Sequence, residues 1–138
     1  MPQKFPIVAL TGASGAGKTN VKEIFQEIFK KLRLRPVYVE GDSFHRYSRD
    51  IMDKKKQEDQ NISLYSPEAN LLQDLELLFL RYSNTGSGQT RHYIHSAEEA
   101  ITHRTEIGNF TGWEAIERDT NLLFYEGHHL LRKLPILI

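Results

Sequence analysis

The hydrophobic positions near the start of the chain predict a strand, a helix and a second strand. Residues 5–11 form a short apolar run with Gly12 directly after it, which is typical of a buried strand. Residues 18–32 place apolar side chains at helical spacing and Lys and Glu elsewhere, which predicts an amphipathic helix. Residues 36–40 are again apolar and end at Gly41, which predicts the second strand. This order opens a βαβ unit, so we expect a parallel sheet with a right-handed crossover.

The middle of the chain predicts two further helices. Residues 42–61 are polar and mixed in charge, and we expect a short helix followed by a mobile loop. Residues 66–68 read Ser-Pro-Glu, which are typical cap and first-turn residues of a helix. An apolar stripe over residues 71–82 follows them, and the glycine-rich stretch 84–88 ends the pattern.

The last part of the chain predicts one more buried strand. Residues 122–125 form the apolar run Leu-Leu-Phe-Tyr, which predicts a third strand ending at Glu126. Residues 90–95 alternate as a strand does, and residues 102–118 have only a weak pattern. The fold class predicted from these elements is α/β, with a mostly parallel sheet flanked by helices.

Composition and charge narrow the classes of function. The chain has 138 residues, 39% hydrophobic and 26% charged, which indicates one globular domain. Lys and Arg together number 18, as do Asp and Glu, so no basic field favours nucleic acid or an anionic membrane as a partner. No run approaches the roughly 20 apolar residues of a membrane span. The absence of Cys excludes thiol nucleophiles and cysteine-ligated metals, and it fits a cytoplasmic location.

A glycine-rich run between the first predicted strand and helix is the strongest chemical signal. It reads Gly12, Ala13, Ser14, Gly15, Ala16, Gly17, Lys18 and Thr19, followed by Asn20. This is a complete phosphate-binding loop (P-loop) in the strand–loop–helix context that the motif requires. Backbone amides would cradle phosphates, Lys18 would reach the β- and γ-phosphates of ATP, and the Thr19 hydroxyl would bind Mg²⁺. The alternative is a glycine-rich turn with a chance lysine.

Asp42 lies just past the end of the second predicted strand. Ligands of open α/β sheets bind outside the carboxyl ends of the strands, so Asp42 should share an edge with the P-loop. A carboxylate there can accept a proton from a hydroxyl that attacks the γ-phosphate. His45, Arg46 and Arg49 follow it and could bind an anionic substrate such as a sugar phosphate. The alternative is a helix-capping Asp followed by solvated basic residues.

Two later positions add to this edge. Glu126 ends the third predicted strand, where an acid is typical of the Walker-B position that holds Mg²⁺. Its alternative is a surface glutamate at a strand end. Arg91, Tyr93 and His95 alternate, so they could point together toward a substrate, or form an ordinary polar strand face.

Several short stretches of the sequence, taken together in their order along the chain, resemble the bacterial (class I) phosphoribulokinases. Besides the P-loop, these blocks are Glu-Gly-Asp-Ser-Phe-His-Arg at residues 40–46, Ser-Pro-Glu-Ala-Asn at 66–70, Arg-His-Tyr-Ile-His at 91–95, Gly-Asn-Phe-Thr-Gly-Trp at 108–113 and Phe-Tyr-Glu-Gly at 124–127. The resemblance covers residues 5–127. It implies a P-loop kinase fold and Mg²⁺-dependent transfer of the γ-phosphoryl group of ATP to ribulose 5-phosphate, giving ribulose 1,5-bisphosphate.

The resemblance also implies roles for single residues. Asp42 would be the catalytic base and Glu126 a second acid near the metal, while Lys18 and the rest of the P-loop would hold ATP. His45, Arg49, Tyr93 and His95 would bind the sugar phosphate. Because bacterial members form oligomers, a homo-oligomer is a further expectation.

The chain departs from the family in several places. Many bacterial members have Thr at the position of Lys18, and some have Lys at the position of Asp53. The family continues well beyond the Tyr-Glu-Gly block, so we expect the N-terminal part of a kinase core at residues 1–127, an atypical tail at 128–138 and a truncated sheet. The alternatives are a nucleotide-binding remnant without turnover and a related uridine or sugar kinase.

Overall fold

The central element of the structure is a four-stranded parallel sheet. The computed structural model describes residues 5–11, 18–63, 66–127 and 136–137. The strands are β1 (Ile7–Thr11), β2 (Pro36–Glu40), β5 (Leu122–Gly127) and β6 (Ile136–Leu137), in the order β2–β5–β1–β6. Every neighbouring pair is parallel, which confirms the predicted sheet. β5 lies between β1 and β2, so the two strands of the opening βαβ unit are not direct neighbours.

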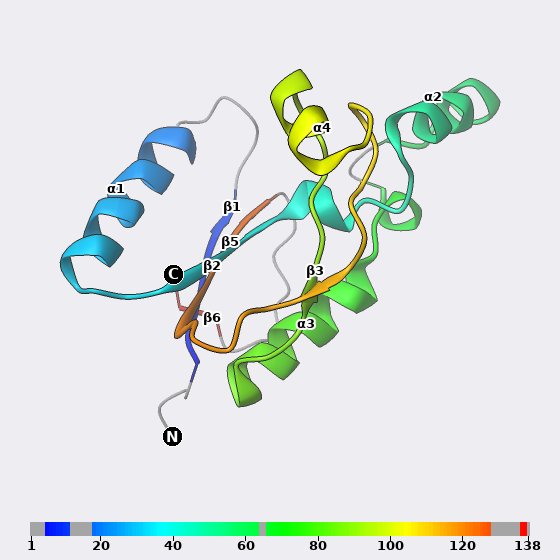
Figure 1. Cartoon of the computed structure of the whole chain (residues 1–138). Coiled ribbons are helices and arrows are strands. Elements are labelled where there is room, and N and C mark those ends of the chain that lie inside the picture. Colours follow the sequence, from blue (N-terminus) through cyan, green and yellow to red (C-terminus); the bar gives the residue numbers. More distant parts are fainter. Residues whose placement is uncertain (1–4, 12–17, 64–65, 128–135, 138) are drawn as a thin grey trace.

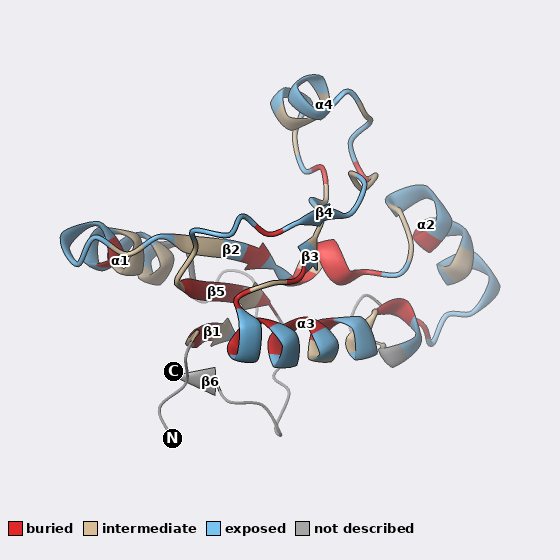
Figure 2. Cartoon of the chain, turned by 60° about the horizontal axis from the view of Figure 1, so that its bottom comes forward, coloured by how far each residue is buried: buried red, intermediate tan, exposed pale blue. Residues whose placement is uncertain are grey.

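Two helices cover opposite faces of this sheet. α1 (Lys18–Lys31) lies on one face and α3 (Leu72–Thr85) on the other (Figure 1). Side chains of β5 alternate between them, so that Phe124 packs with Phe29 of α1 while Tyr125 packs with Phe79 of α3. Leu123 and Tyr125 of β5 form one core cluster with the inner side of α3, while Leu122 and Phe124 form a second cluster with Phe29 of α1 (Figure 2). Burial on both faces explains why β5 is a continuous apolar run in the sequence.

The segment between β2 and α3 carries short helical elements. A 3₁₀ turn, η1 (Gly41–Phe44), follows β2, and α2 (Arg49–Glu58) follows it. The predicted start of the next helix at Ser66 is wrong, because residues Pro67–Ala69 form a 3₁₀ turn and α3 begins at Leu72. The Ser66 hydroxyl accepts the N–H of Ser63 at 2.8 Å, and the Ser66 carbonyl accepts the N–H of Ala69 at 3.0 Å. Ser66 therefore closes a local turn, and hydrogen bonds of this kind compete with helix formation.

The predicted strand over residues 90–95 is largely absent. Only β3 (Gln89–Thr90) pairs, antiparallel with β4 (Glu114–Ala115), and Tyr93 makes one isolated bridge to Phe110. Between these strands the chain forms α4 (Ala97–His103), which stands away from the sheet (Figures 1 and 2). The pattern analysis did not predict this helix. Its N-cap is Ser96, whose hydroxyl accepts the N–H of Glu99 at 3.2 Å, so the Ser-x-x-Glu capping signal was present in the sequence.

Two further expectations from the sequence concern a membrane span and the boundary after residue 127. Among the described helices, none is both long and apolar enough to cross a membrane. The predicted boundary after residue 127 borders residues 128–135, which lie outside the described residues.

Candidate active site

The carboxyl ends of β1, β2 and β5 meet at one edge of the sheet. Glu40 of β2 and Leu10 of β1 are both register partners of Glu126 on β5, and turn η1 continues directly from Glu40. Asp42 in this turn therefore shares an edge with Glu126 and with the start of α1, as the strand pattern predicted. This edge is where an α/β sheet places its ligand.

The P-loop itself is only partly within the described structure. Residues 12–17 lie outside the described residues, and the side chains of Lys18 and Thr19 are likewise not described. The backbone of α1 begins at Lys18, directly after the glycine-rich run, and Asn20 is exposed in its first turn. The ATP contacts assigned to Gly12, Ala13, Ser14, Gly15, Ala16, Gly17, Lys18, Thr19 and Asn20 therefore stay predictions.

Asp42 lies between two imidazole rings. The Nε2 atom of His45 is 3.5 Å from one carboxylate oxygen of Asp42, and the Nε2 atom of His95 is 3.7 Å from the other. His95 is closer to a third acid, with its Nε2 atom 3.2 Å from a carboxylate oxygen of Glu40. The side chain of His45 is 10% exposed and that of Asp42 is 39% exposed. A substrate can thus reach the carboxylate of Asp42 from solvent, and both histidines lie beside that carboxylate.

Tyr93 joins this group through ring contacts. Its ring centroid lies 4.8 Å from that of His95 and 6.1 Å from that of His45. The structure therefore gathers three of the four side chains predicted for the sugar phosphate around Asp42. The described contacts of the fourth, Arg49, are with Gly108, whose carbonyl accepts the Arg49 N–H at 2.9 Å. The role of Arg49 as a substrate residue stays a prediction.

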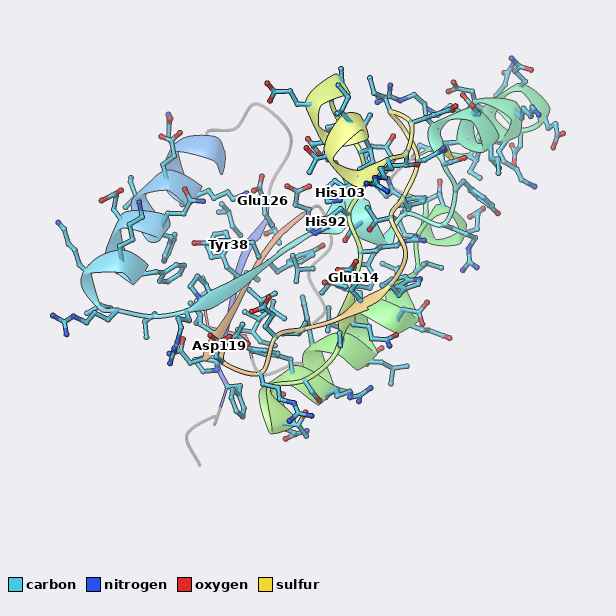
Figure 3. All side chains as sticks on the ribbon, in the orientation of Figure 1. Tyr38, His92, His103, Glu114, Asp119 and Glu126 are labelled. Atoms are coloured by element: carbon cyan, nitrogen blue, oxygen red, sulfur yellow. The ribbon has the colours of Figure 1, made fainter. Side chains whose placement is uncertain are left out.

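Glu126 is paired with a lysine that the sequence analysis did not single out. The Nζ atom of Lys22 on α1 is 3.7 Å from a carboxylate oxygen of Glu126, and the two side chains are 25% and 24% exposed. The same Nζ lies 5.7 Å from the ring centroid of Tyr38, whose pKa is raised by burial. Tyr38 and Glu126 both lie on the α1 side of the sheet (Figure 3). Lys22 and a cation such as Mg²⁺ would therefore compete for the negative charge of Glu126.

One acid and one lysine, Glu40 and Lys22, thus extend the candidate site beyond its predicted residues. Glu40 was seen only as the end of a strand, although it occupies on β2 the position that Glu126 occupies on β5. Lys22 falls on the polar face of the predicted helix. The available signal was its position one helical turn after Lys18, the lysine of the P-loop. Within the described ranges, no group of three or more His, Asp or Glu residues has the arrangement of a metal site.

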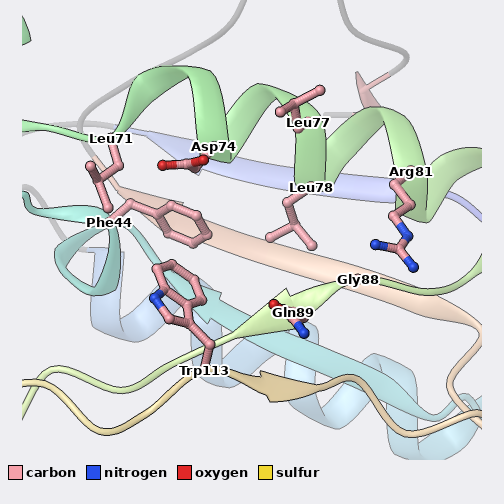
Figure 4. A pocket seen from close by; sticks show the side chains of 9 residues that line it. All are labelled: Phe44, Leu71, Asp74, Leu77, Leu78, Arg81, Gly88, Gln89 and Trp113. Atoms are coloured by element: carbon pink, nitrogen blue, oxygen red, sulfur yellow. The ribbon is translucent and has the colours of Figure 1, made fainter.

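A cavity of about 390 Å³ lies behind turn η1, between α3 and the β3–β4 pair (Figure 4). Phe44 of η1 forms part of its wall and contacts Trp113 edge-on, with ring centroids 5.5 Å apart. Asp74 of α3 also lines it. The cavity is therefore separated from Asp42 by the turn itself.

Comparisons with known proteins agree with this geometry. The model of the phosphoribulokinase/uridine kinase family matches residues 7–136. The chromosomal phosphoribulokinase of Cupriavidus necator (strain H16) is 48% identical over 134 residues, which cover 94% of this chain and 46% of that protein. The phosphoribulokinase of Xanthobacter flavus is also 48% identical over 134 residues, with the same coverage of 94% and 46%. The chain spans about half the length of the curated relatives it matches.

Solved structures show the same relation. The phosphoribulokinase from Rhodobacter spheroides superposes with a TM-score of 0.80 at 36% identity, covering 98% of this chain and 48% of that one. The D-glycerate 3-kinase from Cryptococcus neoformans var. grubii gives a TM-score of 0.56 at 16% identity, covering 90% of this chain and 42% of that one, and is similar in fold alone. The predicted α/β fold with a mostly parallel sheet is confirmed.

Proposed function

Because the chain belongs to the phosphoribulokinase/uridine kinase family, we propose that it transfers the γ-phosphoryl group of ATP to a hydroxyl of a sugar phosphate. Ribulose 5-phosphate is the proposed acceptor and ribulose 1,5-bisphosphate the product, since both curated relatives named above are phosphoribulokinases. The cytoplasmic location and the homo-oligomer expected from the sequence belong to the same proposal.

The observation that carries the proposal is the position of Asp42 between His45 and His95 at the carboxyl edge of the sheet. In the proposed reaction the acceptor hydroxyl attacks the γ-phosphorus as its proton passes to the Asp42 carboxylate. The bond between the γ-phosphorus and the β–γ bridging oxygen breaks, and ADP leaves. A carboxylate that is 39% exposed can accept this proton and later release it to water.

The ATP side of the proposed site uses α1 and the end of β5. The P-loop residues would hold the phosphates, and Lys18 would stabilise the charge on the transferring group. Thr19 and Glu126 would hold Mg²⁺, and the oxygen donors at this edge fit that ion, which prefers carboxylate and hydroxyl ligands. When bound, Mg²⁺ supplies neutralisation of the phosphate charge. Lys22 partners Glu126 in this structure and supplies a positive charge at the same place.

The acceptor side of the proposed site is the group of His45, Tyr93 and His95, with Arg49 as a further candidate. Imidazolium and phenol groups donate hydrogen bonds to phosphate and hydroxyl oxygens. The ring contacts of Tyr93 with both histidines keep the three side chains in one group. These donors match the phosphate and hydroxyl oxygens of a sugar phosphate, so we propose a sugar phosphate over a neutral nucleoside as the acceptor.

A panel of acceptors tests the proposal. The 138-residue chain with ATP and Mg²⁺ is given ribulose 5-phosphate, other pentose phosphates or uridine, and ADP release is followed for each. We expect the largest rate with ribulose 5-phosphate. A preference for uridine would overturn the acceptor assignment, and ATP binding without any acceptor-dependent ADP release would mean a nucleotide-binding remnant.

A further inference from the structure

Arg91 connects turn η1 to the segment that follows β3. Its Nε atom donates to the carbonyl of Ser43 at 2.8 Å, and its Nη2 atom donates to the carbonyl of His45 at 2.6 Å. These carbonyls belong to the residues on either side of Phe44, and Ser43 directly follows Asp42. The guanidinium therefore binds the main chain of turn η1, which carries the proposed base, and of His45, which caps the turn.

The surroundings of Arg91 fix the guanidinium in place. Its Cζ atom lies 3.7 Å from the ring centroid of Phe110 and 4.6 Å from that of Trp113. Burial lowers the pKa of Arg91, and the negative charge of Asp74 acts in the opposite direction. Within the described residues, no carboxylate lies within ion-pair distance of it, and its two hydrogen bonds above go to backbone carbonyls. A partly buried cation with this bonding is typical of a structural brace rather than of a free substrate ligand.

Turn η1 is held from its other side by independent bonds. The N–H of Leu71 donates to the Phe44 carbonyl at 2.7 Å, and the N–H of Arg46 donates to the Ala69 carbonyl at 2.8 Å. Inside the turn, the His45 N–H donates to the Asp42 carbonyl at 3.2 Å. Two sets of hydrogen bonds therefore hold turn η1 and the residues directly after it. One set comes from Leu71 and Ala69, just before α3, and the other comes from Arg91.

We propose that Arg91 is a positioning residue, which holds turn η1 so that Asp42 and His45 keep their relative orientation for phosphoryl transfer. The inference rests on the proposed function for its catalytic consequence. Of the two interpretations that the sequence left open for Arg91, the inference disfavours a substrate residue, because its described donors bind carbonyls of the turn segment. Arginine suits this role because its planar fork reaches two carbonyls while it stacks on two aromatic rings, which lysine cannot do.

The first test needs no enzymatic activity. Arg91→Lys keeps the charge and loses the fork, and Arg91→Met removes both. Amide hydrogen exchange measured by NMR should become about tenfold faster at His45 and Leu71 in either variant, as expected for the loss of one or two hydrogen bonds to charged groups. Exchange in β5 should be unchanged. Arg81→Met is the matched control, because Arg81 is exposed and its Nε donates only to the Ser87 hydroxyl, at 3.2 Å.

The second test separates positioning from general stability. If Arg91 acts through Asp42, Arg91→Lys should lower kcat about tenfold with unchanged KM for ATP, yet cause no further loss in an Asp42→Asn background. Unchanged exchange at His45 and Leu71 would overturn the inference, as would losses that multiply in the double variant. A wild-type chain without acceptor-dependent turnover would contradict the proposed function alone, and the exchange result would still decide whether Arg91 holds the turn. If Arg91→Met fails to fold, Arg91→Lys carries both tests.

Discussion

Glu40 and Glu126 are register partners on the neighbouring parallel strands β2 and β5, yet each lies beside a different nitrogen-bearing side chain. Glu40 lies 3.2 Å from the Nε2 atom of His95, whereas Glu126 lies 3.7 Å from the Nζ atom of Lys22. This difference divides the carboxyl edge of the sheet into two halves. The half near α1 faces the start of the P-loop helix, and the half near η1 faces Asp42 and the histidines. The proposed function uses the first half for Mg·ATP and the second for the acceptor.

The pairing of Lys22 with Glu126 predicts how the chain responds to Mg²⁺. Removing Lys22 frees the carboxylate, so Lys22→Met should lower the Mg²⁺ concentration needed for ATP binding about threefold, as for a partly exposed ion pair of about 0.5–1 kcal/mol. Glu126→Gln should raise that concentration, because a ligand is lost. ATP binding measured by calorimetry over a series of Mg²⁺ concentrations checks both.

Lys30→Met is the control for this prediction. Lys30 lies on the same helix and pairs with Glu27 at 3.8 Å, but both side chains are well exposed and away from the carboxyl edge. It should leave the Mg²⁺ requirement unchanged. An equal response from Lys22→Met and Lys30→Met would mean that only the net charge of the helix matters, and that Glu126 holds no metal.

The contacts of His95 predict a defect confined to the acceptor. His95→Gln removes the imidazole between Glu40 and Asp42, and it should raise the KM for the sugar phosphate about 10-fold or more, as expected for a lost hydrogen bond to a charged group. The affinity for ATP should not change. Steady-state kinetics with each substrate varied in turn measures both quantities.

His103→Gln is matched to His95→Gln. His103 stacks on His92 with ring centroids 5.3 Å apart and belongs to α4, outside the acid and histidine group. Its substitution should leave both KM values unchanged. If His95→Gln instead weakens ATP binding, His95 belongs to the nucleotide half of the site and the division between the two halves is incorrect.

Gly41 is predicted to accept no side chain. A Cβ atom there would lie 2.9 Å from the Tyr125 hydroxyl oxygen and 3.0 Å from the Cα atom of Gly127, which is backbone and cannot move aside. Gly41→Ala should lower the free energy of unfolding by about 1–3 kcal/mol, in the range of overpacked substitutions. Urea denaturation measures this loss. Gly112→Ala is the control, because its Cβ would meet open space, and a comparable loss in both variants would refute this packing argument.

Long periodic patterns made most of the fold predictable from the sequence. β2 has the predicted bounds, α1 ends one residue before its predicted end, and the αL conformation of Gly86 ends α3 inside the predicted glycine-rich stretch. These elements bury a continuous stripe or run against one sheet, so hydrophobic pattern and structure coincide. The start of α3 was wrong because Ser66 closes a turn of its own.

The short helix α4 was not predicted because the hydrophobic pattern carries no signal for it. α4 has seven residues and no buried side chain, so it left no hydrophobic period to detect. In the site, Asp42 and Glu126 share an edge because both follow the carboxyl ends of parallel strands, and the sequence pattern predicts that the strands are parallel. The pairings of Glu40 with His95 and of Lys22 with Glu126 join residues from separate elements. For Arg91 the sequence left two interpretations open, a substrate residue or part of a polar strand face, because alternation says nothing of the backbone carbonyls that accept its hydrogen bonds.

If Asp42 is the base in phosphoryl transfer, Asp42→Asn should remove the acceptor of the proton and little else. The amide keeps the shape of the side chain but cannot accept the proton, so the acceptor-dependent rate of ADP release should fall about 10²–10⁴-fold. The Kd for Mg·ATP should stay the same, because Asp42 lies on the acceptor half of the edge.

The decisive measurement is therefore the turnover of wild-type chain and Asp42→Asn with ribulose 5-phosphate, made beside ATP binding on the same samples. We expect a large loss of turnover with unchanged ATP affinity. Turnover that persists in Asp42→Asn would contradict the role of Asp42 as the base. A parallel loss of ATP binding and native structure would also contradict it and would leave Asp42 as a structural residue of turn η1.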